Sequence, residues 1–261
     1  MGIIEYLRTD RAGGVRLKDE YRKQLTGKLN GYLEFLNYMR LDNKHFSESY
    51  SFDIKSRSPR SNPYFDGETM LCMIRAAKYL GYANLIPLIE DSAMVMAKHY
   101  TIDRWRWDHD SRKTKGFFQW GSMAFWEYQD AGWTNSEVFA DCVLALSWWM
   151  LHTHRTLERT GNTAYAYEGI IHAYLVAKSR NNQAALNDLG NTIDKGLFKL
   201  TSWQVGGPLQ SNNEFLASNQ TNDPLATGGI MNGRQDARLR IDVTQHQMHA
   251  VILALNYVYN D

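Results

Sequence analysis

The chain has 261 residues, a formal net charge of +1 and 13% aromatic residues. This length allows one large domain with a sizeable core, and the balanced charge gives no electrostatic argument for nucleic acid as a partner. The sequence contains no run of 18 apolar residues, so no membrane span is predicted.

Hydrophobic periodicity predicts a mainly α-helical protein, because strand-like alternation is scarce and five prolines leave long uninterrupted segments. The predicted helices cover about 18–40, 66–81, 84–100, 117–130, 135–155, 163–180, 183–203 and 242–259. We expect one domain over residues 1–261, in which residues 1–60 form an N-terminal helix and an irregular lead-in. Residues 207–241, rich in Gly and Asn and poorly periodic, are expected to form a long loop.

Two kinds of helix alternate along the chain. Segments such as CVLALSWWML and GIIHAYLVA are apolar nearly all round, which predicts burial on every side, whereas ANLIPLIEDSAMVMAKHY is amphipathic. Short turns join helix 66–81 to helix 84–100 and helix 163–180 to helix 183–203, and short turns make antiparallel neighbours. Cys72 and Cys142 lie within apolar runs, so buried free thiols are predicted rather than a disulfide.

A faint internal repeat connects two of these helical pairs. YFDGETMLCMIRAAKYLGYANL resembles YAYEGIIHAYLVAKSRNNQAAL at an offset of 102 residues, and both place an aromatic residue, an acid and a glycine at the start of a buried helix. A repeating unit of two helices indicates an array of helical hairpins. Buried inner helices ringed by amphipathic outer ones favour a closed toroid over an open solenoid.

The segments PYFDGETMLCMIRAAKYLG, AYEGIIHAYLVA and IDVTQHQMHAVILAL resemble the α/α-toroid proteins. These include glycan hydrolases, polysaccharide lyases and sugar epimerases, and the resemblance is architectural and covers residues 60–261. It implies an α/α toroid, partial or complete, with a site in the bowl formed by the N-terminal ends of the inner helices. Glycan-active toroids are frequently exported, so the resemblance favours a periplasmic or secreted protein, although no signal peptide is visible.

The helix starts carry the candidate catalytic residues, which are Asp66, Glu68, Glu168 and His246. Each has a simpler explanation. Asp66 is a natural N-cap, and an acid such as Glu68 or Glu168 stabilises the first turn of a helix through the helix dipole. Asp242 and Gln245 fit a capping box at the start of the last helix.

His246 and His249 are three residues apart and therefore share one helix face. The usual helical metal motif spaces its histidines by four residues, and no further ligand cluster has recognisable spacing. We therefore predict no metal and no cofactor, and expect at least one histidine to transfer a proton or bind substrate. The alternative is a core histidine satisfied by hydrogen bonds.

Two polar regions supply candidate substrate contacts. Residues 104–110 alternate charge with indole, and indole faces stack on sugar rings; the alternative is a surface loop anchored by tryptophan. Arginines near residue 240 would suit the carboxylate of a uronate. The predicted substrate-binding residues are Tyr64, Arg104, Trp105, Trp107, His109, Tyr167, Arg238, Arg240, Gln245 and His249.

We expect a glycan-processing enzyme that hydrolyses a polysaccharide or oligosaccharide by paired carboxylates, one protonated and one activating water or acting as nucleophile. One alternative is a lyase or epimerase that abstracts a proton beside a uronate carboxylate, with a Tyr or His as base. A second alternative is a non-catalytic toroid that binds a polysaccharide or a protein. The oligomeric state does not follow from the sequence.

Overall fold

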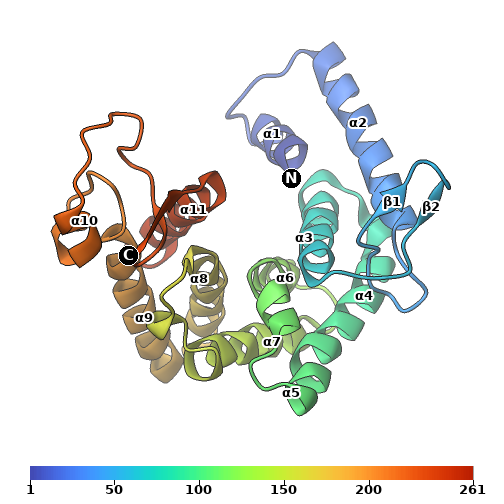
Figure 1. Cartoon of the computed structure of the whole chain (residues 1–261). Helices are drawn as coiled ribbons and strands as arrows, with labels where there is room; N and C mark the ends of the chain where they lie inside the picture. The colour runs from blue at the N-terminus through green and yellow to red at the C-terminus, as the bar shows by residue number, and fades with distance from the viewer. Residues whose placement is uncertain (261) are drawn as a thin grey trace. The chain divides into compact units, whose positions relative to one another are not determined.

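The computed structural model describes residues 1–260 and is predominantly α-helical (Figure 1). The all-α class predicted from periodicity is confirmed. The chain forms two compact units, Met1–Cys142 and Val143–Asp261, whereas a single domain is predicted from the sequence. The boundary between the units falls within helix α7. Among the described residues, no helix is long and apolar enough to cross a membrane.

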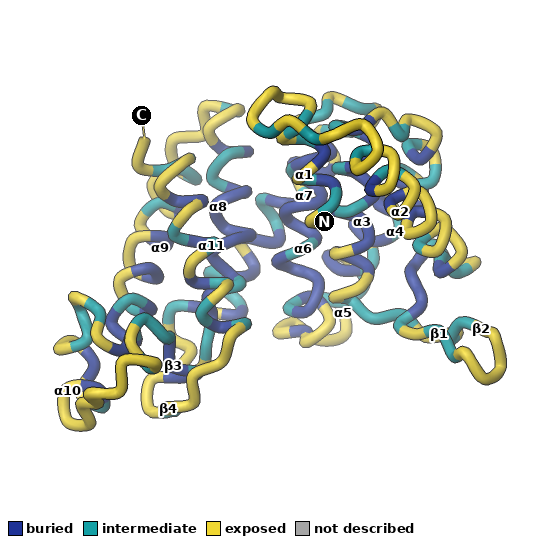
Figure 2. The backbone as a smooth tube through the Cα atoms, turned by 90° about the horizontal axis from the view of Figure 1, so that it is seen from above, coloured by how far each residue is buried: buried dark blue, intermediate teal, exposed yellow. Residues whose placement is uncertain are grey.

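Unit 1 is built from helices and one small hairpin. Its elements are α1 (Gly2–Arg11), α2 (Asp19–Tyr38), β1 (Tyr50–Ser51), β2 (Ser56–Arg57), α3 (Pro63–Leu80), the 3-10 turn η1 (Ala83–Leu85), α4 (Ile86–Lys98), the π-helical turn η2 (His99–Asp103), α5 (Arg104–Trp107), α6 (Arg112–Asp130) and the start of α7 (Ser136–Trp148). Helices α3 and α6 form the buried centre, while the β1–β2 hairpin is largely exposed (Figure 2).

The start of α3 is encoded locally. Asn62 is the N-cap, its side chain accepts a hydrogen bond from the Tyr64 amide, and Pro63 follows at the first helical position. The helix therefore starts three residues before the predicted position, and Asp66, interpreted as a cap from the sequence, lies inside the first turns instead. Gly81, with a φ of 84°, ends the helix in the left-handed conformation.

Glycine lets α3 and α6 approach closely. A Cβ on Gly67 would lie 2.6 Å from the Trp120 Cβ and 2.9 Å from the Gly121 amide nitrogen. Both distances are shorter than atomic contact allows, so the close packing of these two helices depends on the absence of a side chain at Gly67.

Unit 2 contains the rest of the chain. Its elements are the end of α7, the π-helical turn η3 (Trp149–Thr153), the 3-10 turn η4 (Thr156–Glu158), α8 (Ala164–Ser179), α9 (Gln183–Thr201), the 3-10 turn η5 (Gln210–Asn212), α10 (Glu214–Ser218), β3 (Met231–Gly233), β4 (Asp236–Leu239) and α11 (Ile241–Tyr257). Helix α8 is the buried element, and α9 and α11 both pack against it. The expected loop 207–241 contains a short helix and an antiparallel hairpin.

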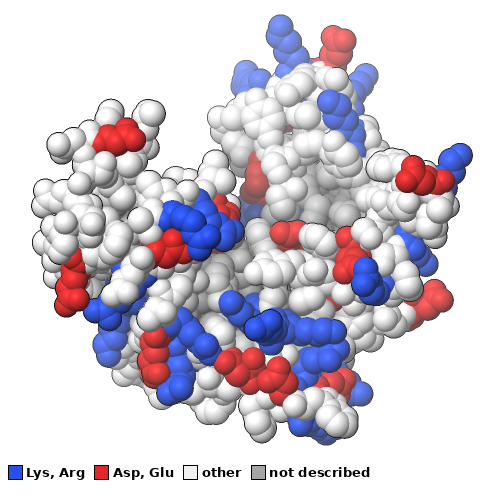
Figure 3. Space-filling model, in the orientation of Figure 1, with Lys and Arg blue, Asp and Glu red and all other residues white. Residues whose placement is uncertain are grey.

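Cys72 and Cys142 are free thiols, as predicted, but both are partly exposed and not fully buried. The capping box predicted at Asp242 is wrong, because the N-cap of α11 is Arg240, whose side chain makes no capping hydrogen bond. Basic and acidic side chains are interspersed on the face shown in Figure 3, which agrees with the nearly neutral net charge.

Candidate functional site

Unit 2 brings three of the predicted site residues together. Glu168 lies in the second turn of α8, and its side chain is fully buried. His246 and His249 lie on one face of α11, and their Nδ1 atoms are 3.2 Å and 3.0 Å from the same oxygen, Oε1 of Glu168. The i, i+3 spacing in the sequence thus corresponds to two imidazoles that share one carboxylate oxygen.

The carboxyl group of Glu168 is held in its ionised form. Burial acts to raise its pKa, but hydrogen bonds and charge interactions from His246 and His249 outweigh burial, and the net pKa lies below the usual value. A carboxylate that stays ionised is a hydrogen-bond acceptor and not a proton donor. Glu168 is therefore suited to orient a base, and unsuited to act as a general acid.

The hydrogen bonds determine which imidazole nitrogens carry protons. Because an ionised carboxylate only accepts, each neutral imidazole must donate through Nδ1–H, which leaves Nε2 as an acceptor. The His246 side chain is 17% exposed and that of His249 is 41% exposed, so both rings reach the surface of unit 2. A partly exposed histidine that is oriented by a buried carboxylate can take up and return a proton.

His172 lies one turn after Glu168 on α8. It is buried, and its Nδ1 lies 2.6 Å from the main-chain oxygen of Glu168. This contact holds the ring of His172 against its own helix.

Asp66, the corresponding acid of unit 1, has a different environment. It is fully buried, and its Oδ2 atom is 2.6 Å from both His45 Nδ1 and the Tyr100 hydroxyl. Its Oδ1 atom accepts from the Phe46 amide at 2.7 Å. All of these partners are buried. The carboxylate thus ties together three segments of unit 1 and has no solvent contact, which does not suit the catalytic role predicted for it.

A second histidine, His99, contacts the His45 partner of Asp66. The rings of His45 and His99 are in edge contact at 4.7 Å, and the Arg104 guanidinium donates to His99 Nε2 at 3.0 Å. Burial, followed by the neighbouring cations, lowers the pKa of His99 to about 4, so this ring is neutral near pH 7. Arg104, a predicted substrate contact, is instead engaged with an internal histidine.

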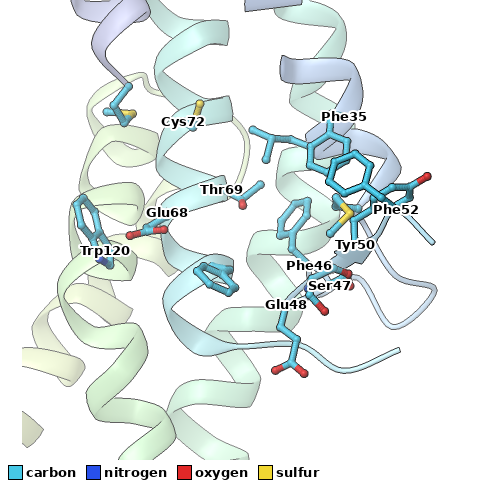
Figure 4. Close-up of a pocket in the computed structure, with 15 residues that line it drawn as sticks. Phe35, Phe46, Ser47, Glu48, Tyr50, Phe52, Glu68, Thr69, Cys72 and Trp120 are labelled. Atoms are coloured by element: carbon cyan, nitrogen blue, oxygen red, sulfur yellow. Dashed lines mark hydrogen bonds between the residues drawn. The ribbon is translucent and has the colours of Figure 1, made fainter. Parts of the chain in front are cut away.

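Glu68 lines a cavity of about 570 Å³ in unit 1 (Figure 4). Most of the lining is apolar, and it includes the aromatic residues Phe35, Phe46, Tyr50, Phe52, Phe65 and Trp120. The Glu68 side chain points toward Trp120 in Figure 4. Partial burial raises its pKa above the usual value. In the described part of the chain, no hydrogen bond or ion pair engages this carboxyl group.

The other aromatic residues predicted to contact substrate differ in how far they are exposed. Trp107 is 88% exposed, and Tyr64 is exposed at the start of α3. The Trp105 indole nitrogen is buried and has no hydrogen-bond partner among the described residues. His109 is exposed in the segment between α5 and α6.

Tyr167 is a core residue rather than a surface contact. It is fully buried, and its ring fills the space over Gly196 of α9, where a Cβ would lie 1.9 Å from the ring. Burial raises the pKa of Tyr167 to about 12. This position does not suit the substrate contact predicted from the sequence, because the ring packs α8 against α9.

The arginines near α11 form local ion pairs. Arg238 Nη2 pairs with Asp236, and Arg240 Nη2 pairs with Asp242 at 2.6 Å. Both arginine side chains are more than half exposed. They can therefore exchange these partners for an anionic ligand at small cost. Gln245 also lies in the first turns of α11 and is exposed.

Sequence reasoning missed His45 and Tyr100, which complete the Asp66 environment. His45 lies in an irregular segment 21 residues before Asp66, so no periodic spacing connects the two. Among residues 1–260, no group of three or more His, Cys, Asp or Glu side chains is arranged to hold a metal ion.

Comparison with known proteins identifies no relative. No protein-family model matches the chain, and neither a curated protein sequence nor a solved structure is significantly similar to it.

Proposed function

We propose that the chain is a glycan-processing enzyme in which His246 transfers a proton and Glu168 orients its imidazole. The observation that carries this proposal is the pair of contacts from His246 and His249 to one buried, ionised carboxylate oxygen. Such an arrangement leaves Nε2 of each neutral ring able to accept a proton.

This geometry favours proton abstraction over hydrolysis by Glu168. A hydrolase needs a protonated carboxyl group and a second carboxylate on either side of the scissile bond. Glu168 is buried, ionised and occupied by two imidazoles, so it cannot donate a proton in that way. Removal of a proton beside a uronate carboxylate requires a base such as His246 and a cation to neutralise the carboxylate. Arg238 and Arg240 precede α11 and are candidates for the second role.

We propose a glycan as the substrate because of the way the helices are arranged. We propose that α3–α4 and α8–α9 are hairpin units of an α/α toroid, because each places a buried helix before a more exposed one. In each unit the buried helix carries an acid followed by glycine, Asp66–Gly67 in α3 and Glu168–Gly169 in α8. The resemblance to toroid lyases and epimerases then favours a uronate-containing glycan as substrate.

The test is an assay on uronate-containing and neutral polysaccharides with three readouts. A lyase produces an unsaturated uronate that absorbs ultraviolet light, an epimerase incorporates deuterium from solvent without cleavage, and a hydrolase releases reducing ends alone. We expect one of the first two activities, and expect Glu168→Gln and His246→Gln to lower its kcat by roughly 10²- to 10⁴-fold, the usual contribution of acid–base catalysis. Substrate affinity should change little.

Asp188→Asn and His152→Gln provide matched controls. Asp188 and His152 form an exposed carboxylate–histidine pair in the same unit, at 3.2 Å, and are expected to be dispensable. Release of reducing ends alone would instead support hydrolysis. Glycan binding without turnover by the parent protein would support the non-catalytic alternative.

A further inference from the structure

We propose that the cavity beside Glu68 binds an organic ammonium compound that has an aromatic or apolar body. This site is separate from the proposed acid–base group, since every residue that lines it belongs to unit 1 (Figure 4). The proposal rests on the size of the cavity, its aromatic lining and its charge.

The size and lining suit a small organic molecule. The volume of about 570 Å³ falls within the usual range of roughly 300–1,000 Å³ for ligand pockets. Phe35, Tyr50 and Phe52 form one wall, with the Phe35 and Phe52 rings 6.0 Å and 5.4 Å from that of Tyr50 in edge contacts. Phe52 is 85% exposed, so a large apolar surface remains for a ligand to cover.

The charge of the lining favours a cation. Two carboxyl groups, Glu48 and Glu68, line the cavity, and no Lys, Arg or His is among the described residues that do so. The amino group of Met1 lies beside Cys72 and does not engage Glu68. Glu48 already pairs with Arg60 at 2.8 Å. Glu68 is therefore the carboxyl group without a counter-charge.

Aromatic faces and a carboxylate are complementary to an ammonium group. The negative face of an aromatic ring attracts a cation within about 6 Å, and aromatic cages of this kind bind quaternary ammonium ligands. A cation beside Glu68 would offset the cost of holding its carboxylate in a partly dry environment. A neutral molecule of the same shape would gain the apolar contacts alone.

The experiment compares benzyltrimethylammonium with its neutral isostere, neopentylbenzene, and with benzoate. Binding is measured by calorimetry and by the tryptophan fluorescence of the intact chain. We expect the ammonium compound to bind at least roughly tenfold more tightly than the neutral isostere, because one ion pair and one cation–π contact together contribute over 1.4 kcal/mol. Benzoate should bind more weakly than either.

Substitutions in and near the cavity test whether the probes bind beside Glu68. Glu68→Gln should abolish the preference for the cation, and should retain the fold because no hydrogen bond or ion pair among the described residues depends on this carboxyl group. Glu34→Gln removes an exposed acid of α2 that does not line the cavity, so it should leave affinity unchanged. Phe52→Ala should weaken binding of both the cation and the isostere. Circular dichroism checks that each variant is folded.

Equal affinity for the cation and the isostere, or no binding of either, would overturn the proposal. A cation preference that survives Glu68→Gln would also overturn it. These outcomes are distinguishable from failure of the proposed function, because the probes are not glycans and Glu168→Gln should leave their binding intact.

Discussion

Asp66 in α3 and Glu168 in α8 are separated by the 102-residue offset of the internal repeat, and each is followed by glycine. Both carboxylates are fully buried and both contact histidine Nδ1. Their partners differ in exposure. His45 and Tyr100 are buried, whereas the His246 and His249 side chains are 17% and 41% exposed. The same local motif thus forms a closed structural link in unit 1 and, in unit 2, contacts two partly exposed histidines.

The largest effect on stability is expected at the closed link. Asp66→Ala leaves the His45 ring, the Tyr100 hydroxyl and the Phe46 amide without their acceptor. Loss of one member of a buried, hydrogen-bonded charged network costs about 3–5 kcal/mol, and urea denaturation should show a loss of that size. Asp53→Ala, at an exposed hairpin position, should change stability by less than about 0.5 kcal/mol. Similar results for the two variants would contradict the structural role of Asp66.

A smaller effect is expected where α3 meets α6. Gly67→Ala places a Cβ 2.6 Å from the Trp120 Cβ, and overpacking of this kind costs about 1–3 kcal/mol. Gly27→Ala is the matched change in α2, where a Cβ would meet nothing within 4 Å, and it should stabilise the protein by about 0.5–1 kcal/mol. Thermal denaturation of both variants measures the contrast, and stabilisation by Gly67→Ala would refute the close packing.

The pH dependence of stability should show that Glu168 is ionised in the folded protein. Its pKa in the folded protein is lowered below the ordinary value of 4.5, so its contribution to stability is fully present above pH 4.5. That contribution is lost as the pH falls through the lower folded pKa. The stability of the wild type should therefore fall more steeply below pH 4.5 than that of Glu168→Gln, as measured by urea denaturation across pH. Parallel curves would show that Glu168 is not held ionised by its histidines.

The smallest effect is expected at the arginines before α11. Arg238 forms an exposed ion pair with Asp236, and such pairs contribute about 0–1 kcal/mol. Arg238→Ala should therefore change the melting temperature little. It should raise KM for a uronate substrate several-fold if this arginine binds the carboxylate. An unchanged KM would remove Arg238 from the proposed site.

The sequence predicts helices well where local signals are present. Asn62 and Pro63 are a capping signal that places the start of α3 even earlier than periodicity suggests. The RWRW segment, for which the sequence predicts substrate contacts or a surface loop anchored by tryptophan, forms the short helix α5 directly after a π-helical turn. Hydrophobic periodicity carries no information about such short helices, because they bury no continuous face.

The site was only partly predictable from the sequence, because its residues come from segments that lie far apart in the chain. Glu168 and His246 were predicted because the toroid resemblance implies a site at the starts of the buried helices, and the packing of α8 against α11 brings the two residues together. His45 has no such context. Its contact with Asp66 arises from the path of an irregular segment, which no periodicity in the sequence specifies.

The tautomeric states of the histidines test the central claim most directly. Long-range ¹⁵N–¹H NMR spectra of the protein at neutral pH report which nitrogen of each ring carries the proton. We predict that His246 and His249 are protonated at Nδ1 with Nε2 unprotonated, and that Glu168→Gln disturbs both states. Protonation of both rings at Nε2, unaffected by Glu168→Gln, would contradict a role for Glu168 in preparing either histidine as a base.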